Sequence, residues 1–224
     1  MRRILFVIFA LAGLGLLLSL GTWQVKRLTW KETVLAEIES RIAAAPVALP
    51  IAPDREADRY LPVAVTGEML EGEVHVLVSV KQVGPGYRVI SSMEVGDRYV
   101  LVDRGFIPLE AKDTPRVIGA MEVIGNLHWP EEIDGFTPEA DVDANIWFAR
   151  EVDQLAALLG TEPVLIIARN KTDPEITPLP VSTTGIPNDH LQYAITWFGL
   201  ALVWSAMMAY FLWRTRAVKT RAES

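Results

Sequence analysis

Three side chains at the start of an apolar run near the C-terminus have the types and spacing to hold a flat, hydrophobic cofactor. His190 stands directly before the run, and Tyr193 and Trp197 follow at i+3 and i+7, on the same face of the predicted helix. An imidazole at a membrane edge with two large rings below it suits axial ligation of a porphyrin iron. The alternative open from these residues alone is an interfacial histidine beside a belt aromatic.

The two other histidines lie in the central part of the chain. His75 is flanked by Val74 and Val76 within a predicted strand, and His128 precedes Trp129 at a strand end. We interpret both as structural or surface residues.

The composition excludes several other chemistries. The chain of 224 residues has no cysteine, which rules out disulfides, Cys-ligated zinc, iron–sulfur clusters and thiol catalysis. It has no nucleophile-elbow, zinc-protease, Walker or dinucleotide-binding motif, and Gly84-Pro85-Gly86 is typical of a tight turn. A pI of about 5.1 makes nucleic acid an unlikely partner. We therefore expect no enzyme active site.

The elements that must position His190 begin with two apolar runs. Half of the residues are hydrophobic and the mean hydropathy is +0.24. A positive average is unusual for a purely soluble domain and indicates membrane segments. Residues 4–23 form the first predicted transmembrane helix, because Ile4–Leu20 carries no charge and Trp23 suits the interface. A cleaved signal peptide is the alternative, but the run is longer than a usual h-region and no A-x-A-like site follows it.

Residues 191–213 form the second predicted transmembrane helix, 23 residues without a charge. The tail 214–224 is basic, and Arg2 and Arg3 precede the first run. The positive-inside rule therefore predicts that both termini are cytoplasmic. Residues 24–189 would then form an extracytoplasmic domain, which holds 15 of the 21 basic and 27 of the 28 acidic residues and so carries a net charge of −12.

The central domain is predicted to be β-rich. Residues 25–44 have apolar side chains at helical spacing and continue the first helix as an extension. From residue 59 the period changes to two. The predicted strands are Tyr60–Glu68, Glu73–Val80, Tyr87–Glu94, Arg98–Ile107, Val117–His128, Ile146–Ala149 and Val164–Arg169. A short helix, Glu151–Leu159, ends at Gly160. Short, regularly spaced strands favour an antiparallel barrel or sandwich.

Four motifs in this order resemble the surfeit locus protein 1 family, called Shy in yeast, whose members are assembly factors of cytochrome c oxidase. They are Gly21-Thr22-Trp23-Gln24 with Arg27 and Trp30-Lys31; Gly67 after Val63-Ala64-Val65-Thr66; Pro85-Gly86-Tyr87-Arg88-Val89-Ile90 with Val100–Pro108; and Asn188-Asp189-His190 with Leu191–Phe198. The chain departs from the family pattern at Asp103 and Phe106, where Asn and Trp are common, and at Asp189, where a second Asn is common.

The resemblance implies an accessory role in building haem-copper oxidases. Bacterial members are similar to proteins thought to bind haem a and to pass it to oxidase subunit I, with haem a synthase as a further candidate partner. His190 carries over as the candidate axial ligand of the haem iron. Tyr193, Trp197, Trp23 and Arg27 would be its neighbours, and Arg27 could pair with a porphyrin propionate or anchor the topology.

A second class of function is a cofactor-free scaffold in the lipid bilayer. Its spans would pack against subunit I through Trp204 and the small residues Gly199, Ala201 and Ser205. A haem-modifying enzyme is a third option, which the missing motifs disfavour. We expect a bacterial inner membrane, because no Arg-rich, acid-poor presequence is evident; the mitochondrial inner membrane is the eukaryotic equivalent.

Overall fold

The structure is a computed structural model that describes the backbone of residues 2–222 and the side chains of residues 4–214. The basic side chains predicted to face the cytoplasm at positions 2, 3, 216, 219 and 221 lie outside the described residues. The chain divides into two compact units, one of residues 1–37 with 184–224 and one of residues 38–183.

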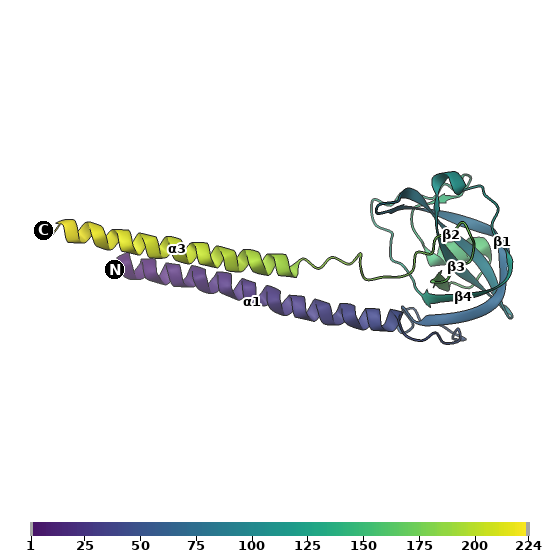
Figure 1. Cartoon of the computed structure of the whole chain (residues 1–224), viewed down its shortest axis with the longest axis horizontal. Coiled ribbons are helices and arrows are strands. Elements are labelled where there is room, and N and C mark those ends of the chain that lie inside the picture. The colour runs from purple at the N-terminus through teal and green to yellow at the C-terminus, as the bar shows by residue number, and fades with distance from the viewer. Residues whose placement is uncertain (1, 223–224) are drawn as a thin grey trace. The chain divides into compact units, whose positions relative to one another are not determined.

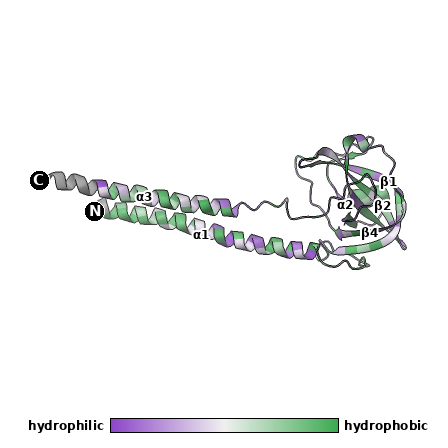
Figure 2. Ribbon diagram, in the orientation of Figure 1, coloured by the Kyte–Doolittle hydropathy of each residue, from purple (hydrophilic) through white to green (hydrophobic). Residues whose placement is uncertain are grey.

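The first unit consists of two long helices (Figure 1), α1 (Arg2–Ile42, whose last residues belong to the other unit) and α3 (His190–Ala222). The first apolar run and its predicted helical extension form one uninterrupted helix, which turns from hydrophobic to polar along its length (Figure 2). Both helices are long and apolar enough to cross a membrane, over Ile4–Ile42 and His190–Arg214.

Aromatic and small side chains join the two helices in antiparallel order. The rings of Phe6 and Phe211 lie 4.6 Å apart, and the indole Nε1 of Trp204 donates to the carbonyl of Ala10 at 2.9 Å. On α3 most of the buried or half-buried residues recur every three or four positions, at 190, 194, 197, 201, 204, 208 and 212, and Ser205 is half-buried beside them. This spacing is that of helices that pack along a shared seam. Ala201 is buried within the described pair, at 3% exposure, whereas Gly199 has open space around it.

The second unit is built on a six-stranded sheet, with the order β2-β3-β6-β4-β1-β5 and a further pairing of β2 with β1. The strands are β1 (Pro62–Val80), β2 (Gly84–Val95), β3 (Arg98–Pro108), β4 (Gly119–Leu127), β5 (Ile146–Trp147) and β6 (Leu165–Ala168). A 3₁₀ turn, η1 (Leu109–Ala111), follows β3, and helix α2 (Val152–Leu159) precedes β6.

The antiparallel barrel or sandwich expected from the sequence is not what the structure shows, because the sheet is mixed. β6 runs parallel to β3 and β5 runs parallel to β1, while the other pairings are antiparallel. The chain between β3 and β6 is long and includes α2, and a crossover of this kind allows parallel pairing. The prediction treated each strand as half of a hairpin, which allows antiparallel neighbours only.

The two strands predicted on either side of Gly72 are in fact one strand, β1. Its first half pairs with β4 and its second half with β2, and the register shifts between Met69 and Glu73. Gly72 has φ +91°, so the Glu71-Gly72 turn signal marks a bulge and not a hairpin. A bulge lets one strand bend and change partners without breaking.

The core fills the space between the sheet and α2. Fully buried side chains from four strands, Val63, Leu101, Leu127 and Ile166, pack with Leu155 of α2. Helix α2 ends as predicted, with Gly160 in the left-handed conformation at φ 67°. The predicted strand 146–149 is shorter in the structure and covers only two residues, and Tyr60, expected to start a strand, has φ +70° and lies outside β1.

Candidate functional site

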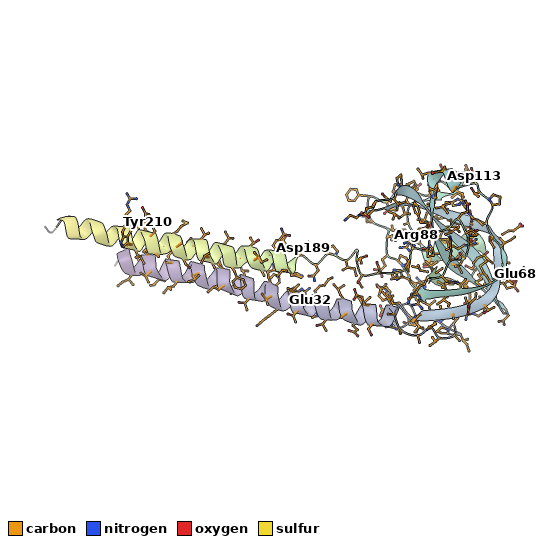
Figure 3. All side chains as sticks on the ribbon, in the orientation of Figure 1. Glu32, Glu68, Arg88, Asp113, Asp189 and Tyr210 are labelled. Carbon is orange, nitrogen blue, oxygen red and sulfur yellow. The ribbon has the colours of Figure 1, made fainter. Side chains whose placement is uncertain are left out.

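The first turn of α3 presents the imidazole of His190. The amide of Tyr193 donates to the carbonyl of Asp189 at 3.1 Å, which makes Asp189, labelled in Figure 3, the residue that precedes the first helical turn. His190 therefore occupies the position that the sequence predicts. Its side chain is only half-buried, so one edge of the ring stays accessible.

The imidazole is held by Gln24 of α1. Nδ1 of His190 lies 2.8 Å from Oε1 of Gln24, a side chain that is only 8% exposed. An amide oxygen is a hydrogen-bond acceptor, so in this orientation the proton of a neutral imidazole resides on Nδ1. The lone pair is then on Nε2, and among the described residues Gln24 is the one hydrogen-bond partner of this ring.

The packing of the helix pair explains how Gln24 reaches His190. Gly21 lies one turn before Gln24 on α1, and a Cβ atom there would be 2.8 Å from the ring of Phe198. Similarly, a Cβ atom on Gly13 would be 2.6 Å from the ring of Trp204. The two glycines let aromatic rings of α3 lie directly against the backbone of α1. The helices are therefore close enough for Gln24 to contact His190.

The predicted neighbours of His190 are not all brought to the imidazole. Trp197 is half-buried on the face of α3 that carries His190. Trp23 and Tyr193 are each 55% exposed and present their rings outward beside the pair. The guanidinium of Arg27 lies 3.9 Å from the ring centre of Trp30, one turn further along α1.

Gln24 is the residue that the prediction from sequence missed. It closes the Gly21-Thr22-Trp23-Gln24 motif, of which the sequence predicts only Trp23 as a neighbour of His190. The available signal was its spacing: Gln24 is three residues from Gly21, so the two share a helix face. The spacing does not identify the residue of α3 that this face contacts, because His190 lies 166 positions away in the chain.

The other two histidines lie in the β-sheet unit. His75 is buried and lies within hydrogen-bonding distance of Glu73 and of Asn145, at 2.8 Å and 3.3 Å. His128 stacks on Tyr60 with ring centres 5.1 Å apart. Burial, together with the positive charges of Arg150 and Arg59, lowers the pKa of His128 to about 4. Both side chains contact neighbours within the β-sheet unit.

The contact with Gln24 leaves Nε2 of His190 as the ring nitrogen that could bind a metal. A histidine that binds a metal through one nitrogen commonly donates from the other nitrogen to an oxygen, which sets its tautomer and ring orientation. Gln24 supplies that oxygen here. Among the residues that the structure describes, no group of three or more His, Asp or Glu side chains could hold a metal ion by itself.

Comparison with known proteins agrees with the family resemblance of the sequence. The SURF1 family model matches residues 11–202. The chain is 31% identical over 225 residues to surfeit locus protein 1 of Rattus norvegicus, which covers 90% of this chain and 72% of the relative. It is 32% identical over 220 residues to the protein of that name from Homo sapiens, covering 87% and 72%. A SURF1-like protein of Monosiga brevicollis is 32% identical over 215 residues, covering 86% and 82%. The chain belongs to the SURF1 family.

Proposed function

We propose that this chain is a membrane-anchored assembly factor for haem-copper cytochrome c oxidase, which binds haem a transiently and aids its insertion into subunit I. Family membership supports the assembly role. The observation that carries the haem proposal is the 2.8 Å contact between Nδ1 of His190 and Oε1 of Gln24.

In this proposal His190 is the axial ligand and Gln24 is its positioning residue. The Gln24 oxygen keeps the proton on Nδ1 and directs Nε2 away from α1. If haem binds here, Nε2 of His190 would be the protein ligand of its iron. Trp23 and Tyr193, both more than half exposed, offer rings beside the macrocycle, and Trp197 lines the helix seam below.

The exposure of the site suits a carrier. A protein that releases its cargo needs modest affinity, and one half-buried histidine provides less binding energy than an enclosed site with two protein ligands. Arg27 is engaged with Trp30 by a cation–π contact and could turn toward a propionate, since this contact contributes about 0.5–1 kcal/mol at an exposed site.

We further propose that both helices span the bacterial inner membrane, or the mitochondrial inner membrane in a eukaryote, with the β-sheet unit on the outer side. The antiparallel packing of α1 and α3 supports this topology, because Phe6 near the start of α1 contacts Phe211 toward the end of α3. The positive-inside rule assigns the side of these two ends to the cytoplasm. His190 then lies at the outer surface of the membrane.

The test is the visible spectrum of the detergent-purified full chain after co-expression with a haem a synthesis pathway. Wild type is expected to show Soret and α bands that His190→Ala removes and that the matched variant His128→Ala retains. Bands that survive in His190→Ala would overturn the ligand assignment. A colourless wild type in cells rich in haem a would overturn the carrier role.

A cofactor-free scaffold for subunit I is the second candidate, and an apolar groove on the helix pair favours it. The groove has a volume of about 230 Å³ and is lined by apolar and small residues: Val7, Ala10, Leu11, Leu14, Trp204, Ser205, Met208, Ala209 and Leu212. Small residues allow close approach of another helix. In this role Ser205→Phe would abolish co-purification with subunit I, whereas Leu202→Phe, at a position 73% exposed and outside the groove lining, would not.

A further inference from the structure

A cavity in the β-sheet unit gathers positive charge that the proposed function does not use. It has a volume of about 430 Å³ and lies between the bulge of β1 and the loop that follows η1. Asp113, labelled in Figure 3, belongs to this loop. The side chains on which the inference rests are Glu73, Ser91, Arg104, Lys112 and Arg116, all of which line the cavity.

Arg104 forms the buried wall of the cavity. It is 1% exposed, and its Nε donates to Oγ1 of Thr172 at 3.1 Å while Nη2 donates to the carbonyl of Val117 at 2.8 Å. Asp173 is the acid closest to it, at 3.7 Å. Asp173 itself accepts hydrogen bonds from the amides of Val117 and Glu175, so much of its capacity as an acceptor is already used.

Arg116 is the second guanidinium, and its hydrogen bonding is incomplete. Its side chain is 5% exposed, and Nη2 donates to the carbonyl of Ala111. Its Nε and Nη1 atoms are buried and have no hydrogen-bond partner among the described residues. A buried donor without a partner costs about 1–3 kcal/mol, so an acceptor that enters the cavity would be favoured.

The acid next to Arg116 does not complete this bonding. Oε1 of Glu73 lies 3.4 Å from Nε of Arg116, an ion-pair distance without a hydrogen bond. The same oxygen lies 2.8 Å from Nε2 of His75. Glu73 is therefore shared between a buried histidine and the guanidinium.

The cavity lining has three basic and three acidic residues, and the basic residues are the more buried ones. Arg104, Lys112 and Arg116 contribute three positive charges, and the two guanidinium groups are close enough that Arg116 disfavours the charge on Arg104. Of the three acids in the lining, Glu73 is half-buried, whereas Glu71 and Asp113 are exposed to solvent. Asp173, which pairs with Arg104 but is not part of the lining, is buried. Ser91, which is 1% exposed, adds a hydroxyl donor to the wall.

We propose that this cavity binds the oxyanion group of a small molecule, a phosphate or a carboxylate, between Arg104 and Arg116. Guanidinium groups bind such oxygens through charge-assisted hydrogen bonds, and Nε and Nη1 of Arg116 are each a donor without a partner among the described residues. The site lies wholly within the β-sheet unit and does not depend on haem binding at His190.

The experiment titrates the detergent-purified full chain with inorganic phosphate and, separately, with citrate, at constant ionic strength in chloride. Calorimetry and thermal unfolding are the readouts. Wild type is expected to bind with a saturable isotherm, and Arg116→Gln to bind at least tenfold more weakly. Arg55→Gln is the matched control, because Arg55 is an exposed arginine of the same unit paired with Asp153.

The two ligands distinguish the sources of the oxyanion: saturation by phosphate alone assigns a phosphate site, and saturation by citrate alone assigns a carboxylate site. If Arg116→Gln does not fold, Ser91→Ala is the variant to compare with wild type. It removes one hydroxyl donor and is expected to weaken binding severalfold. Absence of saturable binding by either anion overturns the proposal. Equal binding by wild type and a folded Arg116→Gln also overturns it.

Discussion

A Cβ atom on Gly21 of α1 would lie 2.8 Å from the ring of Phe198 on α3. This distance is shorter than any normal carbon–carbon contact, so the two helices can approach as they do only because position 21 has no side chain. Gln24 is one turn away on α1, and Ala194 and His190 are one and two turns before Phe198 on α3. The close contact at Gly21 therefore sets the approach by which Gln24 reaches His190.

Replacing Gly21 with Val is expected to push the helices apart and weaken the contact between Gln24 and His190. Overpacking of this kind costs about 1–3 kcal/mol. Gly15→Val is the matched control, since a Cβ atom at Gly15 meets nothing within 4 Å. Thermal unfolding in detergent, followed by circular dichroism, checks the prediction. An equal loss in both variants would mean that the close approach at Gly21 has no role.

Gln24→Leu is expected to lower haem affinity about 10- to 100-fold while leaving His190 in place, because loss of the second partner of a ligating histidine typically has this effect. Gln24→Glu should retain binding and shift the absorption bands, because a carboxylate increases the electron donation of the imidazole. Thr22→Val is the control, at an exposed position whose hydroxyl bonds only to the carbonyl of Leu18. Unchanged spectra in both Gln24 variants would remove Gln24 from the site.

The buried carboxylate of Asp103 holds two arginines, and its loss should destabilise the β-sheet unit. Its Oδ2 lies 2.6 Å from Nη1 of Arg88 and 3.2 Å from Nη1 of Arg150, and the residue is fully buried. Asp103→Ala would leave two cations without their shared partner, at a cost of about 3–5 kcal/mol.

Asp153→Ala, which breaks an exposed pair with Arg55, should cost less than about 1 kcal/mol. Urea unfolding of the full chain, followed by tryptophan fluorescence, measures both. The prediction concerns a position where the chain departs from its family's common Asn, so Asp103→Asn is an informative third variant. It is expected to retain one hydrogen bond to an arginine and to lose less stability than Asp103→Ala.

Acid should destabilise the protein through His128. Burial lowers its pKa to about 4, whereas the unfolded chain takes up this proton near 6.5. The unfolded state therefore binds more protons between these values, and the contribution is present above about pH 6.5 and lost as the pH falls toward 4. A loss of about 1–3 kcal/mol is expected over that window.

His128→Phe keeps a ring against Tyr60 and should flatten the dependence of stability on pH between 6.5 and 5. The pKa of Glu132 is also lowered, because Arg150 bonds to it. Its titration adds further destabilisation below its usual pKa of 4.5, so the comparison is made above pH 5. Urea unfolding at several pH values is the measurement, and an unchanged slope in His128→Phe would assign the acid sensitivity to other groups.

Local patterns in the sequence were sufficient for the elements that neighbouring residues determine. An uncharged run longer than seventeen residues predicts an apolar helix, whatever the rest of the chain does. The start of α3 at His190 followed from Asn188-Asp189 before an apolar run, and the end of α2 from Gly160. Alternating hydrophobic residues located most of the strands.

Tertiary structure decided which of these elements meet. β1 is one bent strand because two different strands pair with its halves, and the sheet is mixed because β6 returns beside β3 by a long crossover. The spacing of residues carries no information about such partners. The contact of His190 with Gln24 and the cavity shared by Arg104 and Arg116 depend in the same way on packing between distant segments. Periodicity indicates which face of its own helix or strand a residue occupies. A site is made by side chains from several elements, and the packing of the whole chain determines which of these side chains come into contact.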